Sequence, residues 1–162
     1  MTAPLLSVEW IPSGDAGAVE TLLRMRGLVQ AALRDPVAVA QARRLVPEPS
    51  IDAIAELLTD RVRFREDPPL LEYLQAPRAL LDAMRTRGRV TGDCDDVAVL
   101  AAFLGAVHGL PYRFRAVGFS RTGPLLHVYT LLRADGAWRT LDTTRSRTQA
   151  PPVTVRALEL DG

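Results

Sequence analysis

The one cysteine of the chain, Cys94, lies in the segment 92–96 (GDCDD), directly before an apolar stretch. Residues 97–104 are apolar on every side, which predicts a buried helix that begins at Cys94. Unsatisfied N–H groups and the positive end of the helix dipole favour a thiolate there, and the thiolate is the nucleophilic form of cysteine. The Cys94 backbone N–H could also donate to an oxyanion, and Gly92 would let a substrate backbone approach closely. A buried, inert cysteine is the alternative.

Three acidic residues, Asp93, Asp95 and Asp96, surround the cysteine. Acidic side chains near a helix start cap the helix and complement its dipole, and we expect this role for all three. Asp93 is also a candidate for a contact with substrate or oxyanion.

A predicted hairpin brings two more reactive residues together, His127 and Asp142. Asp135-Gly136 lies between two strand-like segments and predicts a two-residue turn, which places Tyr129 opposite Asp142. His127 and Asp142 then share one face of the sheet as diagonal neighbours about 7–8 Å apart, within reach of a hydrogen bond. The carboxylate would orient the imidazole, and the imidazole would accept and return a proton. A surface histidine beside a turn aspartate is the alternative.

The other histidine, His108, is an internal comparison. It follows Cys94 by 14 residues, which is about 21 Å along a helix, so the two side chains cannot touch. A histidine just before Gly109 suits the negative end of the helix dipole.

The elements that must position these residues follow from periodicity and capping signals. Apolar spacing, Asp35-Pro36, Ser50 and Pro77 predict the helices, and period-two alternation with turn residues predicts the strands. We expect helices at 15–34, 36–46, 51–62, 77–87 and 94–108, a short segment near 70–74, and strands at 112–119, 126–133, 137–142 and 153–160. Helices followed by an antiparallel sheet indicate the α+β class.

Composition limits the function. The chain has 162 residues, which predicts one domain, and its net charge of +1 gives no reason to expect nucleic acid, a membrane surface or an acidic partner. All 20 basic residues are arginines, so no lysine side chain can serve as an amine donor. We expect neither a signal peptide at the N-terminus nor a membrane-spanning helix, and a cytoplasmic location is the default.

Several segments together resemble the transglutaminase-like superfamily, and more narrowly its small bacterial and phage-associated members. They are GDCDD (92–96), HGLPYRFRAVGF (108–119), HVYTLL (127–132) and WRTLDTT (138–144), with IAELLTDRVRFREDP (54–68) and APRALLDAMRTRGRVTGDCDD (76–96) upstream. The resemblance covers roughly residues 50–145. Residues 1–49 match nothing in the family, so we expect a helical extension at 1–49 packed on a core at 50–162.

The resemblance implies a papain-like α+β core, in which the buried helix that starts at the cysteine packs on an antiparallel sheet. It also implies a thioester, formed when the thiolate attacks an amide and resolved by water or an amine. Cys94 would be the nucleophile, His127 the base and Asp142 the orienting acid. The second oxyanion donor is open, with Tyr73 and Tyr129 as candidates.

Other functions stay open at this point. The favoured one is a thiol peptidase, amidase or transglutaminase that acts on a protein or peptide without a cofactor. The alternative is a weak or inactive transglutaminase-like module that serves in phage or phage-derived assembly, which would make it virion-associated. Zinc binding by Cys94, His127 and Asp142 is disfavoured, because no close Cys/His spacing supports it. No P-loop is present.

Overall fold

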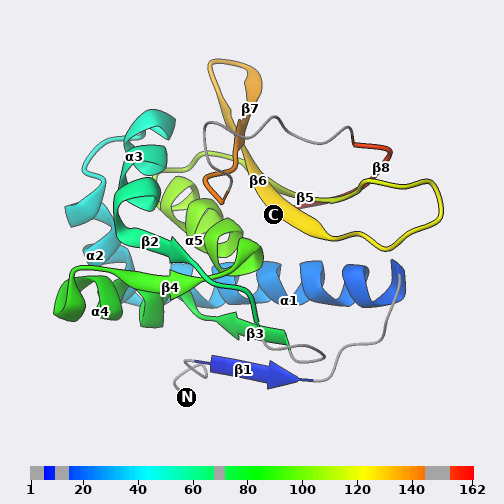
Figure 1. Cartoon of the computed structure of the whole chain (residues 1–162). Helices are drawn as coiled ribbons and strands as arrows, with labels where there is room; N and C mark the ends of the chain where they lie inside the picture. The colour runs from blue at the N-terminus through cyan, green and yellow to red at the C-terminus, as the bar shows by residue number, and fades with distance from the viewer. Residues whose placement is uncertain (1–5, 10–14, 68–71, 145–153) are drawn as a thin grey trace.

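Helices fill most of the first two thirds of the chain, and the main sheet comes last (Figure 1). The computed structural model describes residues 6–9, 15–67, 72–144 and 154–162. The predicted α+β class is confirmed. No described helix is both long and apolar enough to cross a bilayer.

The helices begin and end where the sequence places caps. Asp35 accepts hydrogen bonds from the first N–H groups of one helix and Ser50 from another, and Pro77 opens a third. Gly88, with φ of 74°, provides the left-handed stop after that third helix. The bounds are α1 Asp15–Leu33, α2 Pro36–Leu45, α3 Ile51–Arg61, α4 Pro77–Arg87 and α5 Cys94–Ala106.

The main sheet is antiparallel, with the strand order β7-β6-β5-β8. Its strands are β5 Tyr112–Gly118, β6 His127–Ala134, β7 Ala137–Leu141 and β8 Arg156–Asp161. Asp135 and Gly136 both have positive φ and form the predicted two-residue turn, which confirms the register, with Ala134 opposite Ala137. The last strand is an edge strand next to β5, as expected, although it begins at Arg156 and residue 153 lies outside the described residues.

Two small sheets lie apart from the main one. β1 (Leu6–Glu9) pairs antiparallel with β3 (Glu72–Gln75), and β2 (Val62–Phe64) pairs parallel with β4 (Val90–Gly92). The sequence pattern did not predict β1, β2 or β4, because three or four residues are too few to show a period. Val62, predicted as the last apolar position of a helix, instead begins β2.

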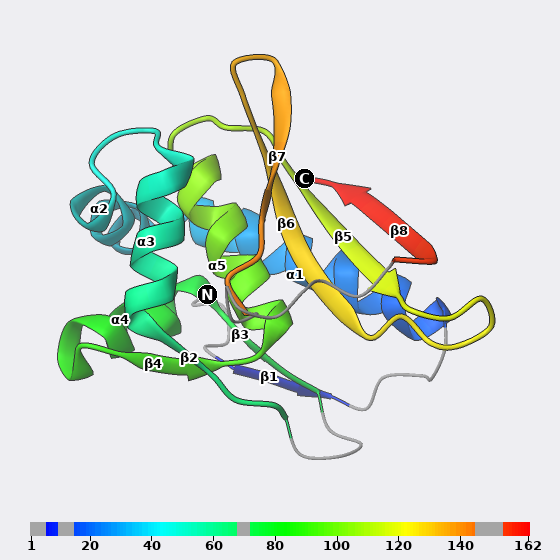
Figure 2. The ribbon, with the colours of Figure 1, turned by 45° about the horizontal axis from the view of Figure 1, so that its top comes forward.

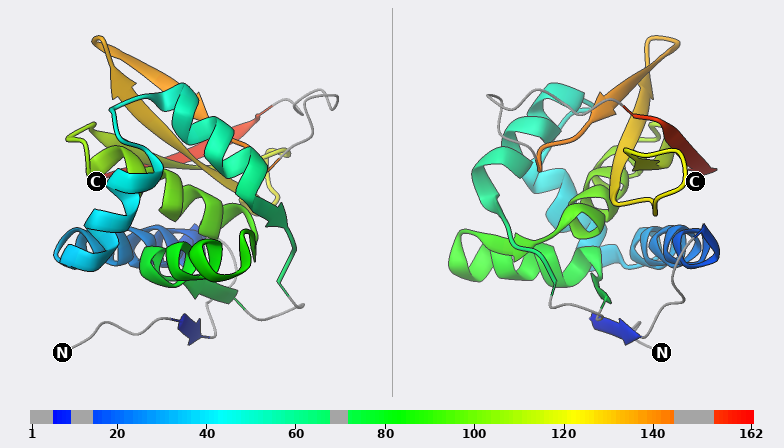
Figure 3. Two further views of the ribbon diagram at one scale, coloured as in Figure 1. Left: turned by 90° about the vertical axis from the view of Figure 1, so that its left-hand side faces the viewer. Right: turned by 45° about the vertical axis from the view of Figure 1, so that its right-hand side comes forward.

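The helix that starts at the cysteine is central. α5 lies between α1 and the main sheet (Figures 1 and 3), and the side chains of Leu100, Phe103 and Leu104 have no exposed area. One cluster of buried side chains extends from Leu22 in α1 to Leu141 in β7. The first 49 residues therefore share their core with the rest of the chain.

Candidate active site

Cys94 is the first residue of α5 and is partly exposed. Asp93, in an extended conformation, is the N-cap, and its carboxylate accepts a hydrogen bond from the Asp96 backbone N–H at 3.4 Å. The predicted capping role of Asp93 is confirmed. The short strand β4 delivers the chain directly to this helix start, so the thiol lies where the unsatisfied N–H groups of a helix point outward.

Gly92 ends β4 and leaves room for the Asp96 side chain. A Cβ atom at position 92 would lie 2.8 Å from both Cβ and Oδ2 of Asp96, closer than real contacts allow. The position of the Asp96 side chain thus explains why residue 92 is a glycine, without the predicted approach of a substrate backbone.

Asp96 joins the start of α5 to strand β3. Its Oδ1 accepts from the Gln75 backbone N–H at 2.7 Å, and its Oδ2 accepts from the Gln75 side-chain Nε2 at 2.6 Å. Burial, together with the charges of Asp93 and Asp67, raises the pKa of Asp96 to about 7, although the bonds from Gln75 oppose this. The sequence predicted only a cap or dipole partner here. The partner is 21 residues away in a four-residue strand, and no local pattern could reveal it.

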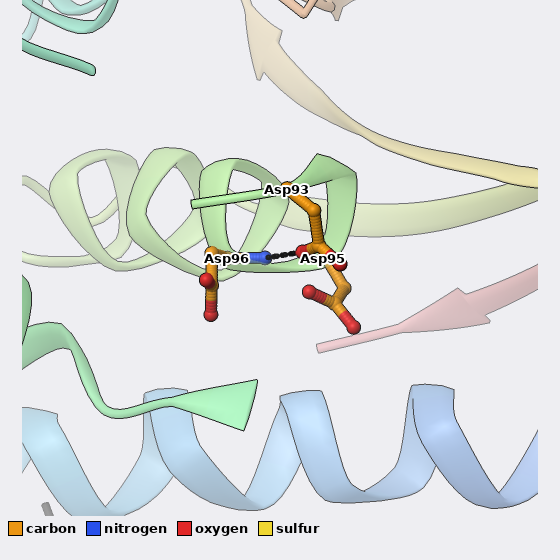
Figure 4. Close-up of side chains that lie close together, drawn as sticks. All are labelled: Asp93, Asp95 and Asp96. Carbon is orange, nitrogen blue, oxygen red and sulfur yellow. Dashed lines mark hydrogen bonds between the residues drawn. The ribbon is translucent and has the colours of Figure 1, made fainter. Parts of the chain in front are cut away.

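Asp93, Asp95 and Asp96 point to one side of the first turn of α5 (Figure 4). One carboxylate oxygen from each lies within 4.8 Å of the others, and Asp95 is only 2% exposed. The cap bond of Asp93 and the Gln75 contact of Asp96 account for two of these carboxylates without a cation. Where these carboxyls are ionised, their charge opposes ionisation of the Cys94 thiol, whereas the helix dipole favours it.

His127 and Asp142 form the contact that the hairpin predicts. His127 Nε2 lies 2.6 Å from Asp142 Oδ2, and the two side chains are 11% and 16% exposed. Since Nε2 is committed to the carboxylate, Nδ1 is the ring nitrogen that remains for proton exchange with another group.

The carboxylate of Asp142 is held from two sides. Its second oxygen, Oδ1, accepts from the Thr144 hydroxyl at 2.7 Å and from the Thr144 backbone N–H at 3.2 Å. Burial alone would raise the pKa of Asp142. The bonds from His127 and Thr144 and the His127 charge outweigh burial and lower that pKa below its ordinary value. Asp142 is therefore ionised at neutral pH.

The cysteine helix packs on the histidine strand. The buried Thr130 of β6 donates its hydroxyl to the Ala98 carbonyl of α5 at 2.7 Å, and Cys94 lies one helical turn before Ala98. α5 and β6 run in roughly the same direction (Figures 1 and 2), so the helix begins at the end where the strand begins. The three candidate residues thus belong to two neighbouring elements and the hairpin that follows.

Strand parity determines the face of the sheet on which the His127 side chain lies. Thr130 faces α5, so His127, three residues earlier, leaves β6 on the opposite face, with Tyr129 and Asp142. β7 ends at Leu141, opposite Thr130, and residues 127–129 therefore have no β7 partner on that edge. This part of β6, which we call its open edge, lies at the same end of the strand as the start of α5 (Figures 1 and 2).

The three remaining residues, Tyr129, Tyr73 and His108, lie in different parts of the fold. The rings of His127 and Tyr129 are tilted, with centroids 5.9 Å apart, so Tyr129 borders the imidazole. Tyr73 lies in β3, where its backbone N–H donates to the Asp67 carboxylate. His108 lies after the end of α5 and donates from Nε2 to the Val46 carbonyl at 2.7 Å, which ties it to the end of α2 instead of the site.

Comparison with known proteins gave no match to a family model, to a curated protein or to a solved structure.

Proposed function

We propose that this chain is a cysteine-dependent acyl-transfer enzyme of the transglutaminase-like kind, with a papain-like core, that acts on amide bonds of a protein or peptide. The observation that carries the proposal is the 2.6 Å bond between His127 Nε2 and Asp142 Oδ2. It engages one ring nitrogen and directs the other away from the carboxylate, on the strand that packs on the cysteine helix. A histidine oriented by a carboxylate is the base that a thiol nucleophile requires.

In the proposed reaction, Cys94 and His127 meet over the open edge of β6. Nδ1 of His127 takes the thiol proton, and Sγ attacks the carbonyl carbon of the amide to form a C–S bond. His127 then returns the proton to the leaving nitrogen as the C–N bond breaks, which leaves a thioester. Water or an amine gives a proton to His127, attacks the thioester carbonyl and releases the thiolate.

Developing negative charge on the carbonyl oxygen needs hydrogen-bond donors. The first N–H groups of α5, including that of Cys94, lack acceptors within the helix and are suitable. Tyr129, beside His127, is the better placed of the two tyrosines for the second donor, because the ring contact puts it next to the reacting histidine.

The acidic residues at the start of α5 give His127 a second role in the proposal, which is to stabilise the Cys94 thiolate. Asp93 and Asp95 lie next to Cys94 in the chain, and negative charge on them opposes ionisation of the thiol, whereas burial favours the neutral form of Asp96 below about pH 7. An imidazolium next to the sulfur supplies the positive charge that would hold the thiolate. Cys94 in this account is activated by its ion pair with His127 more than by its position on the helix.

An activated ester tests the chemistry without knowledge of the natural substrate. Incubation of the wild-type protein with p-nitrophenyl acetate should give a burst of nitrophenol and one acetyl adduct, which hydroxylamine removes, as expected for a thioester. The Cys94→Ala variant should give no such adduct, and His127→Gln should acylate about 10²–10⁴-fold more slowly. His108→Gln changes the other histidine, at the far end of α5, and should behave like wild type.

Decay of the acetyl adduct then separates the two acyl acceptors. Faster decay with added cadaverine, with acetylcadaverine as product, identifies a transferase, and decay unaffected by the amine identifies a hydrolase. An adduct that forms equally well in Cys94→Ala would exclude the proposed nucleophile. A wild-type protein that forms no adduct would favour an inactive assembly module.

A further inference from the structure

An open pocket of about 610 Å³ lies away from Cys94, where α3 passes into β2 and α4 passes into β4. We call it the arginine pocket; it is lined by Thr59, Asp60, Arg61, Val62, Arg63, Gly88 and Arg89. Three of these seven residues carry a permanent positive charge, because guanidinium groups do not deprotonate in proteins.

The three arginines meet at one opening because the end of α3 and the start of β2 lie beside the turn from α4 to β4. Val62 is opposite Val90 in the ladder, and the residues just before this pair are Arg61, the last residue of α3, and Arg89, which follows the left-handed Gly88. Arg63, the second residue of β2, is opposite Thr91, and both side chains lie on the exposed face of this strand pair. The buried Val90 lies on the other face.

Few carboxylates neutralise this cluster. Among the described residues, Arg61, Arg63 and Arg89 form no ion pair, whereas Arg78, for example, contacts both Asp35 and Asp82. Arg61 donates from Nη1 to the Gly88 carbonyl at 2.9 Å, which fixes its guanidinium at the pocket and leaves its other N–H groups available. Asp60 is the one acidic residue of the lining, so the pocket has a net charge of +2.

Three guanidinium groups around one opening repel one another, and an anion between them relieves the repulsion. Guanidinium groups present several N–H donors in a plane that matches the oxygens of phosphate and carboxylate. We propose that the arginine pocket binds an oxyanion group of a ligand, with multiple charge-assisted hydrogen bonds from Arg61, Arg63 and Arg89. This site is independent of the proposed catalysis, because it needs neither Cys94 nor His127.

The pocket is nevertheless linked to the cysteine by one short strand. β4 leads from Arg89 to Cys94 in five residues, at most about 17 Å of extended chain. An anion bound in the pocket would therefore lie near the helix start without occupying the reacting centre.

Titration of the ¹⁵N-labelled full chain with inorganic phosphate, and separately with succinate, at constant ionic strength set by sodium chloride tests the site. The amide signals of Arg63, Gly88 and Thr91 should shift and saturate. Tighter binding of phosphate would indicate a phosphate-bearing ligand, and tighter binding of succinate a carboxylate-bearing one. Shifts that do not saturate with either anion at millimolar concentration would overturn the proposal.

Variants assign the binding to the pocket. Arg63→Gln combined with Arg89→Gln should weaken anion binding at least tenfold, and Asp60→Asn should strengthen it several-fold. These positions are exposed, and Arg61 is left intact because it bonds Gly88. The matched control combines Arg43→Gln with Arg44→Gln, two exposed arginines in the last turn of α2, and should leave binding unchanged. Equal loss in the two double variants would show a general charge effect and contradict the site.

Discussion

At the scale of single residues, the contact between His127 and Asp142 depends on the two residues of one turn. A single inserted residue between the strands would reverse the strand parity and put the carboxylate on the other face. Asp135-Gly136 prevents this, because both residues adopt the positive φ that a two-residue hairpin requires. Turn chemistry was therefore enough to predict the pair from sequence, and the 2.6 Å bond confirms the contact. Its catalytic role remains a prediction.

Replacing Asp142 with Asn tests that role. The amide is nearly the same size as the carboxylate but carries no charge, and its NH₂ group can donate to Nε2 of His127. The proton of the imidazole would then be on Nδ1, which is the nitrogen that must act as the base. We expect the rate of acylation of Cys94 to fall by about 10²–10⁴-fold with little change in the concentration of ester at half-maximal rate. Stopped-flow release of nitrophenol from p-nitrophenyl acetate gives both quantities.

The matched control is Asp135→Asn. It removes one carboxylate from the same hairpin, at an exposed position whose φ of 52° asparagine accepts readily. It should leave the acylation rate unchanged. Equal rates for Asp142→Asn and wild type would mean that the carboxylate orients nothing of catalytic importance.

At the scale of elements, the start of α5 is held by two short strands: the sequence did not predict β4, and for β3 it indicated only a short segment near 70–74. β4 delivers the chain to Cys94, and Gln75 of β3 binds Asp96 in the first turn of the helix. These strands are too short to show a period, and their partners are distant in sequence, so only the folded chain brings them together. The long helices and the hairpin were predictable because each carries its pattern and its caps locally.

The contact between β3 and α5 makes stability depend on pH. Burial raises the pKa of Asp96 from 3.8 to about 7, so the folded chain favours the protonated carboxyl. The resulting stabilisation of the folded chain is fully present below the ordinary pKa of an aspartate carboxyl. It is lost as the pH rises through the pKa that Asp96 has in the folded chain. In the wild-type chain this residue alone should lower the free energy of unfolding by up to about 4 kcal/mol between about pH 4 and pH 7.

In Asp96→Asn, the contribution of residue 96 to this decline should disappear, since asparagine does not titrate and its oxygen can still accept from the Gln75 N–H. Urea unfolding at a series of pH values measures the slope. Glu56→Gln, which removes an exposed carboxyl from α3, should keep the wild-type slope. If Asp96→Asn declines as steeply as wild type, Asp96 does not titrate in this range.

At the scale of the whole molecule, the predicted site combines two groups of residues that were indicated by two unrelated sequence patterns. Helix-end chemistry indicated Cys94, and hairpin register indicated His127 and Asp142. In the structure, α5 packs on β6 through the hydrogen bond from Thr130 to Ala98, so the elements that carry the two groups are neighbours. The face of β6 from which His127 leaves could not be predicted, because it depends on which side of the sheet the helix covers. Functional coupling of Cys94 to His127 over the open edge of β6 is therefore the central claim.

The pH dependence of alkylation by iodoacetamide, compared between wild type and His127→Gln, tests this coupling most directly. The chain has one cysteine, so the rate reports on Cys94 alone. For the wild type we predict fast alkylation with a midpoint well below about 8.5, the usual thiol value, and for His127→Gln a midpoint shifted upwards by at least about one pH unit. Identical profiles for the two proteins would contradict the account.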